Sequence, residues 1–182
     1  MSFTELPLEK AFMLLEPGPV ILVTTRNAKR DNIMTISWHM VLDFTPSFAL
    51  RTGPWNHSYE ALRKHKECVI AIPTIDLAET VVSIGDCSGV EVDKFNRFDL
   101  TPLPASVIHA PLIAECLACI ECRVTDYVKK HGIFILDGIR AWIDPARKER
   151  RTFHANGDGT FVTDGRKINL RRFMKDKVPP GV

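Results

Sequence analysis

Residues 32–40, which read NIMTISWHM, combine side chains that can hydrogen-bond with side chains that can pack against a flat ring. If this segment is a β-strand, its side chains alternate between two faces with a period of two. One face is then apolar and the other carries two hydroxyls and an imidazole. The apolar face holds Met34, Ile36, Trp38 and Met40, and the polar face holds Thr35, Ser37 and His39. Because a solvated face more commonly carries lysine and glutamate, this strand predicts contact with a ligand that needs hydrogen bonds.

A second group of candidate residues lies in the segment RTGPWNHSYEAL. Arg51 and Thr52 end a predicted strand, and Ser58 begins a predicted helix whose first backbone amides are free to bind an anion. The chain contains no glycine-rich phosphate motif of the GxGxxG or GxxxxGKS kind, so a phosphate would depend on hydroxyls, helix amides and scattered cations. The sequence is equally consistent with Ser58 as a simple helix cap and Arg51 as a surface cation.

Three cysteines in the run CLACIEC have the spacing of iron–sulfur ligands. Ferredoxin-type runs add a further cysteine followed by proline, whereas Arg123 and Val124 follow here. In a strand, Cys116 and Cys122 would face one side and Cys119 the other, so they could not surround one cluster. We therefore predict small buried hydrophobic residues and no metal site.

The histidines show no zinc spacing either. His131, in the predicted turn KKHGIF, could point into a cleft or simply lie on the surface.

The bulk composition excludes several functional classes. The 182 residues include 24 basic and 22 acidic side chains, and a net charge of +2 is too small to indicate a nucleic-acid or membrane partner. No apolar segment approaches the ~20 residues of a membrane span, and the start lacks the features of a signal peptide. We therefore expect a cytoplasmic protein whose five cysteines are reduced thiols.

The elements that must position these residues form one predicted domain, residues 1–182. Strands are predicted at residues 20–25, 32–42, 47–52 and 68–73, in two long runs within 112–144, and in a glycine-turn hairpin at 153–165. Helices are predicted at residues 6–15, 57–67 and 76–89, the last with Asp76 as its N-cap, and residues 92–106 are predicted to be an irregular loop. Because the helices do not alternate regularly with the strands, the pattern favours an α+β, mainly β, antiparallel barrel over a doubly wound parallel sheet.

The order of these segments resembles a known family. The quoted pieces are GPVILVTT, NIMTISW, RTGPWNHSYEALRKHKECVIAIP, DKF, KKHGIF and GDGTF. Together, from about residue 19 to residue 161, they resemble the flavin reductase-like, FMN-binding split-barrel family, and most closely its flavoredoxin branch. This resemblance implies a split β-barrel with a few peripheral helices. It also implies a homodimer that holds FMN noncovalently near the subunit interface.

The resemblance also implies roles for individual residues. The cofactor-binding positions would be Asn32, Met34, Thr35, Ser37, Trp38, Arg51, Thr52, Ser58, Tyr59, Lys94, His131 and Phe161. Asn32, Thr35, Ser37 and Trp38 would line the isoalloxazine ring and the ribityl chain. Met34 would contribute mainly through backbone position and packing, and the positions in residues 51–59 would surround the phosphate. His131, the candidate catalytic residue, and Phe161 would close over the flavin, and could do so from the partner subunit. Many relatives carry tyrosine where this chain has Phe161, so that hydroxyl contact is missing here.

The function implied is that of an FMN-binding oxidoreductase or electron-transfer flavoprotein of the flavoredoxin type. Its FMN would accept electrons from NAD(P)H or from a redox partner, and a cation such as Lys94 or protonated His131 would favour the anionic reduced flavin. One alternative is an NAD(P)H:flavin reductase that releases reduced flavin to a partner oxygenase. Another is a non-enzymatic β-barrel that binds some other ligand. The chain shows no nicotinamide fingerprint, so the electron donor stays open.

Overall fold

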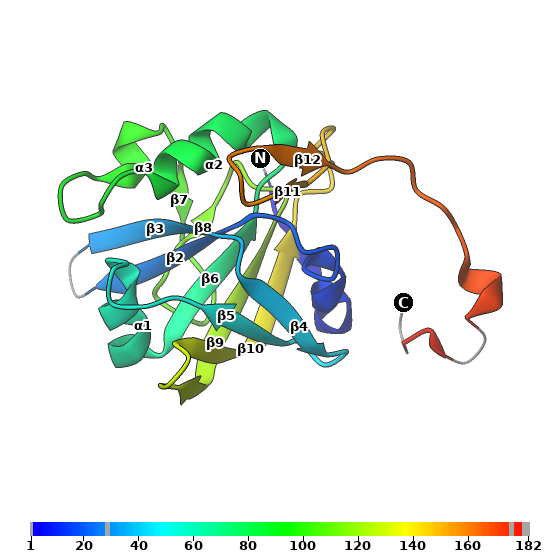
Figure 1. Ribbon diagram of the computed structural model, residues 1–182, viewed down its shortest axis with the longest axis horizontal. Helices are drawn as coiled ribbons and strands as arrows, with labels where there is room; N and C mark the ends of the chain where they lie inside the picture. The colour runs from blue at the N-terminus through cyan, green and yellow to red at the C-terminus, as the bar shows by residue number, and fades with distance from the viewer. Residues whose placement is uncertain (1, 28–29, 175–176, 180–182) are drawn as a thin grey trace.

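The computed structural model describes residues 2–27, 30–174 and 177–179. Its centre is an eight-stranded sheet in which every pairing is antiparallel (Figure 1). The strands of this sheet are β1 (Thr4–Leu6), β2 (Ile21–Asn27), β3 (Arg30–Ile36), β4 (His39–Asp43), β5 (Ser47–Arg51), β6 (Glu67–Ile72), β9 (Ala118–Val128) and β10 (Ile133–Ile143). Two small hairpins pair β7 (Pro102–Leu103) with β8 (Leu112–Ile113) and β11 (Phe153–Ala155) with β12 (Phe161–Thr163). The expected mainly β architecture is therefore confirmed.

The sheet curls because its two outermost strands are neighbours in the sequence. The strand order is β3-β2-β6-β9-β10-β5-β4, so β3 and β4 lie at opposite ends. Only Ser37 and Trp38 separate them. Three steps of about 3.8 Å hold Ile36 and His39 within about 11 Å of each other. The two ends of the sheet must therefore meet at this corner, although β3 and β4 share no ladder in the described chain, and the barrel is open there.

The interpretation of residues 32–40 as one alternating strand is wrong. Met34 and Ile36 are buried in the barrel core, whereas Trp38 and Met40 are 65% and 58% exposed. The physical reason is the corner at Ser37 and Trp38. The chain leaves β3 after Ile36, and the alternation of side chains between two faces does not continue through a bend.

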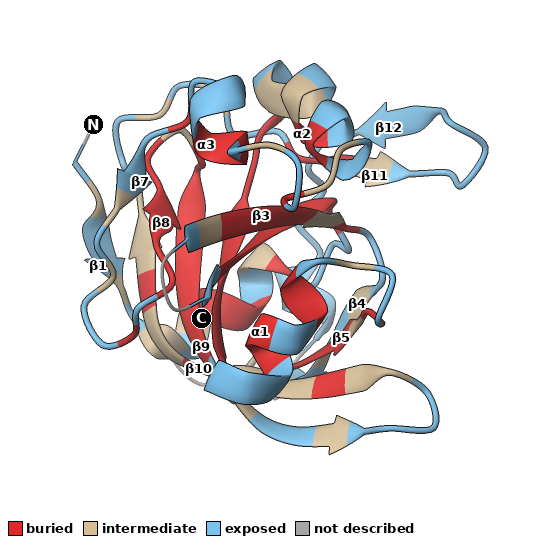
Figure 2. Ribbon diagram, turned by 90° about the vertical axis from the view of Figure 1, so that its left-hand side faces the viewer, coloured by how far each residue is buried: buried red, intermediate tan, exposed pale blue. Residues whose placement is uncertain are grey.

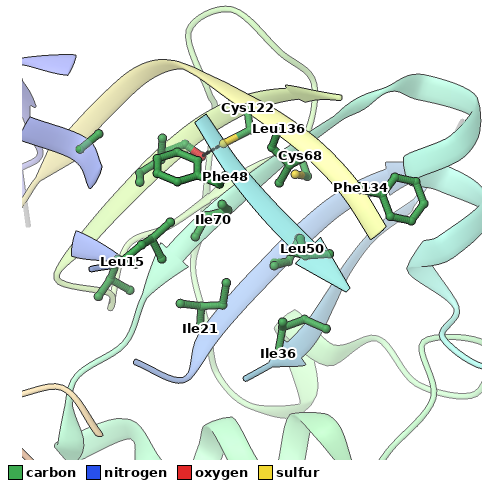
Figure 3. Packing of buried hydrophobic residues seen from close by; sticks show 14 of the residues in the cluster. Leu15, Ile21, Ile36, Phe48, Leu50, Cys68, Ile70, Cys122, Phe134 and Leu136 are labelled. Carbon is green, nitrogen blue, oxygen red and sulfur yellow. Dashed lines mark hydrogen bonds between the residues drawn. The ribbon is translucent and has the colours of Figure 1, made fainter. Parts of the chain in front are cut away.

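Two hydrophobic cores lie on the two faces of the sheet. The inner core fills the barrel and is shown in Figure 3. The outer core lies between the sheet and the segments that cover it, and it contains Phe95, Leu100 and Phe153. Strands β2, β6 and β9 supply alternate residues to both cores, which explains why their buried parts read as continuous apolar runs. In β9 this buried part is residues 118–122, and the rest of the strand is more open.

Short helices surround the barrel. They are the 3-10 helices η1 (Leu8–Leu14), η2 (Ile75–Leu77) and η3 (Arg171–Phe173), and the α-helices α1 (Ser58–His65), α2 (Ala78–Gly85) and α3 (Lys94–Arg97). In the described part of the chain, none of them has the length and apolar character needed to cross a membrane.

Two helix predictions need correction. Asp76 is not a helix cap, because it lies in η2, where its carboxylate accepts hydrogen bonds from Thr74 and Arg147. The predicted irregular loop at 92–106 contains α3, whose N-cap Asp93 accepts a bond from the Asn96 amide at 3.2 Å. A helix of four residues is too short to show a period in the sequence.

The three clustered cysteines are buried free thiols, but their faces differ from the prediction. Cys116 and Cys119 lie together in the outer core, and Cys122 lies in the inner core. The reason is that β9 begins at Ala118, so Cys116 precedes the strand and does not follow its alternation. Burial raises the pKa of Cys119 to about 12 and holds the pKa values of Cys116 and Cys122 well above their usual value. Such thiols are inert as nucleophiles at neutral pH.

Candidate functional site

A hollow of about 310 Å³ opens beside β3, between the loop that precedes α1 and the segment that joins α2 to α3. Figure 2 shows this arrangement, with α2 and α3 on one side of β3 and α1 on the other. The residues that line the hollow are Met34, Thr35, Trp55, Asn56, His57, Ile84, Gly85, Asp86, Cys87, Ser88, Gly89 and Lys94. Three of the sequence-predicted positions, namely Met34, Thr35 and Lys94, are therefore in its wall.

A buried hydrogen-bonded cluster lies next to the hollow. The Thr25 hydroxyl and the Asn32 amide nitrogen Nδ2 both donate to Ser58 Oγ, each at 2.8 Å. Since Ser58 Oγ accepts both bonds, its own proton is left to donate to a further partner. Strands β2 and β3 and the first turn of α1 are joined at this point.

Several buried polar side-chain atoms have no partner. Among the described residues, the buried side-chain atoms without a hydrogen bond are Asn32 Oδ1, His39 Nδ1, Arg51 Nη1 and Thr52 Oγ1. An unpaired buried polar atom costs about 1–3 kcal/mol, so a native chain rarely keeps one without a use for it. Asn32, Arg51 and Thr52 are all positions that the resemblance assigns to the cofactor. The structure therefore presents unsatisfied groups where a ligand was expected.

Gly89 brings the far wall of the hollow against Asn32. A Cβ at this position would lie only 2.1 Å from Asn32 Oδ1 and 2.9 Å from His57 Cδ2. Only glycine allows such a close approach of the backbone. The unpartnered oxygen of Asn32 thus faces the wall of the hollow.

Arg51 lies between two exposed tryptophans. Its guanidinium carbon is 4.5 Å from the ring centre of Trp55 and 5.7 Å from that of Trp38. Gly53 permits this fold, because a Cβ there would overlap the Trp55 ring at 2.2 Å. A guanidinium held against aromatic faces is fixed in orientation and keeps its donors for an anion or a carbonyl.

The turn that carries His131 lies beside Arg51 and Thr52. The Thr52 amide donates to the Gly132 carbonyl at 3.1 Å, and a Cβ on Gly132 would lie 3.6 Å from the guanidinium carbon of Arg51. Gly132 has a φ of +63°, which glycine adopts without strain. His131 itself is exposed. The candidate catalytic histidine is therefore at the same rim, with its side chain in solvent.

Lys94 ties α3 to α2, Thr35 ties β3 to α2, and both residues line the hollow. Lys94 is buried and donates from Nζ to the Ile84 carbonyl at 2.8 Å, and the Thr35 hydroxyl donates to the Val81 carbonyl at 2.6 Å. Burial lowers the pKa of Lys94, and attraction to Cys87 partly offsets this. An ammonium has three protons, so Lys94 keeps donors for a ligand after binding Ile84.

Some predicted site residues lie away from the hollow within one chain. Tyr59 is buried on the opposite side of α1, where its hydroxyl is 2.7 Å from that of Tyr127. Phe161 packs against Phe153 on the β11–β12 hairpin, with ring centres 5.8 Å apart. Ser37 is exposed at the corner. None of these three residues lines the hollow.

The sequence analysis also missed part of the site. The expectation that the first amides of α1 are free is wrong, because Asn56 accepts from the Ser58 amide through Oδ1 and from the Tyr59 amide through its carbonyl. The segment from Asp86 to Gly89 was predicted as the end of a helix and was not named as part of the site. Its Cys-Ser-Gly sequence is typical of a tight turn between helices. The Gly-Pro-Trp sequence before α1 was the other available signal, because a tryptophan in a turn is seldom buried in a core.

The fold and the site together define the class of protein. It is a small, mainly β antiparallel barrel that is open at one corner and has a polar hollow beside its edge strand β3. Sequence comparison gives the family, because residues 13–161 match the Flavin reductase like domain. The chain therefore belongs to the flavin reductase-like family. A curated relative, the uncharacterized protein YddH of Escherichia coli (strain K12), is 28% identical over 91% of this chain and 97% of its own length.

Solved structures share the fold. The FMN-binding domain of a flavin reductases-like enzyme from Shewanella baltica OS155 superposes with a TM-score of 0.85 and 24% identity, over 92% of this chain and 97% of that one. Flavoredoxin of Desulfovibrio vulgaris (Miyazaki F) has a TM-score of 0.77 and 23% identity, over 84% and 89%. These likenesses establish the fold and confirm the expected split barrel.

Proposed function

We propose that this chain binds FMN noncovalently in the hollow beside β3 and acts as an oxidoreductase or electron-transfer flavoprotein of the flavoredoxin type. The observation that carries the proposal is the group of buried atoms without partners, Asn32 Oδ1, Arg51 Nη1 and Thr52 Oγ1. They are acceptors and donors left unsatisfied at positions that the family resemblance assigns to the cofactor. The name of the Shewanella structure, an FMN-binding domain, supports the same cofactor, and that of the Desulfovibrio structure supports the flavoredoxin type.

The donor set suits FMN. Its phosphate is an anion, and Arg51 and Lys94 are the cations beside the hollow. The free proton of Ser58 and the hydroxyl of Thr52 can donate to phosphate or carbonyl oxygens, while Asn32 Oδ1 can accept from a ring N–H or a ribityl hydroxyl. Trp55 supplies an apolar ring to the wall.

When bound, FMN would supply hydride and single-electron transfer. The chain would contribute binding, orientation and charge. Lys94, fixed by the Ile84 carbonyl, would place positive charge beside the cofactor and so favour its anionic form. His131, on the turn that the Thr52 amide holds through Gly132, would hold or release a proton at its imidazole as the catalytic group. NAD(P)H or a redox protein would be the electron donor, in the cytoplasm, where free thiols persist.

We also propose that two copies pair through an exposed apolar face. This face comprises Met40 and Leu42 on β4, Phe44 directly after β4, Met13 on η1, and Trp38 at the corner. Phe44 packs on Phe12 of η1 with ring centres 5.4 Å apart, which joins the two elements into one surface. Exposed apolar residues on an edge strand invite self-association, and a second copy could bring Phe161 toward the hollow.

Introducing a charge into this face tests the homodimer. Leu42→Glu should yield a monomer in sedimentation experiments, because a carboxylate would be buried without a partner at the interface. The matched control is Val82→Glu, an exposed apolar residue on α2 that lies outside the face. A wild-type chain that sediments as a monomer, or a Leu42→Glu chain that still dimerises fully, would contradict the proposed face.

The visible absorbance spectrum tests the function. Purified protein titrated with FMN should shift the flavin bands with saturation, and anaerobic NADH, NADPH or a reduced protein carrier should then bleach them. FMN that stays bound through reduction supports the flavoredoxin type. Steady NAD(P)H oxidation that depends on added, exchanging flavin would replace it with the flavin reductase alternative. A spectrum identical to that of free FMN would overturn the proposal and leave the non-enzymatic barrel.

A further inference from the structure

Cys87 differs from the other cysteines of this chain in its access to solvent. All five cysteines are free, and four of them are buried in the cores. Cys87 lies on the turn after α2, is only partly buried, and lines the hollow beside β3. A reagent that enters the hollow would therefore meet one thiol in its wall.

A cation lies next to this thiol. Cys87 Sγ and Lys94 Nζ both donate to the Ile84 carbonyl, at 3.8 Å and 2.8 Å. An ammonium close to a cysteine favours the thiolate, which is the reactive form. The carbonyl end of α2 and the neighbouring Asp86 act in the opposite direction. Access and Lys94 together distinguish Cys87 from the core thiols, and burial raises the pKa values of three of these, Cys116, Cys119 and Cys122.

The same wall is prepared for a ligand by an independent feature. Asn32 is only 6% exposed, its Oδ1 has no partner, and that oxygen is directed at Gly89, two residues from Cys87. A group attached to Cys87 would lie in the hollow, whose wall includes both Cys87 and the Gly89 that this oxygen contacts. With a volume of about 310 Å³, the hollow has little room for both an adduct and a second molecule.

We propose that Cys87 is a thiol-modification site at which a low-molecular-weight disulfide closes the hollow to FMN. The effect on FMN rests on the proposed function, whereas the selective reactivity of Cys87 does not. The site would couple flavin loading to the balance of disulfides and thiols around the protein.

The chemistry is a thiol–disulfide exchange. The Cys87 thiol loses its proton to solvent, and its sulfur attacks one sulfur of the small disulfide. The bond between Cys87 and that sulfur forms as the original S–S bond breaks, and the second half leaves as a thiolate. The disulfide is the oxidant, and one of its halves is reduced. A dithiol reverses the reaction by the same exchange.

The first experiment measures the selectivity on the full chain without FMN. With 5,5′-dithiobis(2-nitrobenzoate), we expect one thiol to react rapidly and the other four to react only after denaturation. Peptide mapping of wild-type protein after a short pulse of N-ethylmaleimide should place the label on Cys87. Fast labelling of a different cysteine, or no labelling before denaturation, would overturn the modification site.

Two variants sharpen this measurement. Cys87→Ser should abolish the fast phase, and the matched change Cys119→Ser, which removes a buried thiol, should leave it intact. Lys94→Met should slow the fast phase severalfold at constant pH, because the cation beside the thiol is lost. An unchanged rate in Lys94→Met would remove the role of Lys94 in the proposal.

The second experiment measures FMN binding by three samples of wild-type chain: untreated, modified with glutathione disulfide, and modified and then reduced with dithiothreitol. We expect the modified sample to bind FMN at least tenfold more weakly and the reduced sample to recover. Equal affinity in all three would refute the closure while leaving the flavoprotein intact. If the untreated chain itself fails to bind FMN, the proposed function and the closure both fail, and the labelling experiment alone decides whether Cys87 is a modification site.

Discussion

Two regions of this molecule bury polar side chains, and they differ in whether the buried polar atoms have hydrogen-bond partners. Around the hollow, buried atoms of Asn32, Arg51 and Thr52 lack partners. On the outer face of the sheet, the buried carboxylates of Glu67 and Glu121 are saturated with donors, an arrangement we call the carboxylate clamp. Both regions lie on the same barrel, so the difference belongs to the sites and not to the fold.

The carboxylate clamp fixes the segment that covers the outer core. Glu121, fully buried, accepts from the Ser106 amide at 2.9 Å, the Val107 amide at 2.9 Å and Trp142 Nε1 at 2.8 Å. Glu67 Oε1 accepts from the amide of His109 at 2.9 Å. In the carboxylate clamp, the buried carboxylates have partners and hold the covering segment in place. Near the hollow, the buried polar atoms without partners can still bind a ligand.

The largest effect is expected at the clamp. Glu121→Ala should lower the free energy of unfolding by about 3–5 kcal/mol, because three buried donors lose their acceptor. Chemical denaturation followed by circular dichroism measures this, with Glu60→Ala on the exposed face of α1 as the control. Glu121→Gln should cost less, because one oxygen remains. The folded Gln variant should bind FMN like the wild type, and a parallel loss of FMN affinity would erase the distinction between the two regions.

At the hollow, the expected effect is on binding instead. Asn32→Ala should weaken FMN binding about tenfold or more, equivalent to at least ~1.4 kcal/mol, because the unpartnered acceptor is removed. The unfolding free energy should fall by no more than about 1.5 kcal/mol, the value of one hydrogen bond to Ser58. Fluorescence quenching of FMN measures the first and denaturant titration the second.

Thr25→Val is the matched control for Asn32→Ala. It removes the other donor to Ser58 Oγ but leaves Asn32 Oδ1 in place. Its stability should fall by a similar amount, while FMN affinity stays within about threefold of the wild type. If both variants lose FMN equally, the unpartnered oxygen is not the binding group.

The smallest effect is expected at a saturated but half-exposed carboxylate. Burial acts to raise the pKa of Asp164, but hydrogen bonds from His154 and Thr152 outweigh it, so the pKa lies below its usual 3.8. A carboxyl whose folded pKa is depressed stabilises the protein above its unfolded pKa and loses that contribution as pH falls through the folded pKa. With its side chain 36% exposed, Asp164 should contribute less than about 1 kcal/mol.

Thermal unfolding of Asp164→Asn measures this contribution. At pH 7 the melting temperature should fall by less than about 4 °C, and the difference from the wild type should shrink toward pH 3. Asp137→Asn, which removes an exposed carboxylate on β10, is the control for the loss of a charge. A difference in melting temperature between wild type and Asp164→Asn that grows on acidification would show that Asp164 is not held ionised by its partners.

The same contrast explains what the sequence could predict. Runs of β-branched and apolar residues identified β2, β5, β6 and the paired β11 and β12, because burial of a strand leaves a period or a continuous run. The corner at Ser37 and Trp38 left no such mark, since apolar and polar residues continue to alternate through it. Its position depends on where the β4–β5 hairpin joins the sheet, through the pairing of β5 with the distant strand β10, which local patterns do not contain.

The site was predictable where its residues belong to a regular element or to a familiar motif. Met34, Thr35 and Lys94 were named from the sequence, whereas Cys87 and Gly89 were not, because they occupy a turn whose place in the fold is set by the packing of α2. The clamp was also invisible. A glutamate within an apolar run gives no indication whether it will find three donors from a distant loop or face the solvent.

The two-residue corner between β3 and β4 has a consequence for how this chain can vary. The bend itself places little constraint on the side chains of Ser37 and Trp38, because both are exposed, although Trp38 also contacts the Arg51 guanidinium. Adding or removing one residue would instead turn β4 over, sending Met40 and Leu42 inward and Val41 out. An insertion or deletion at this corner should therefore be tolerated less well than a substitution.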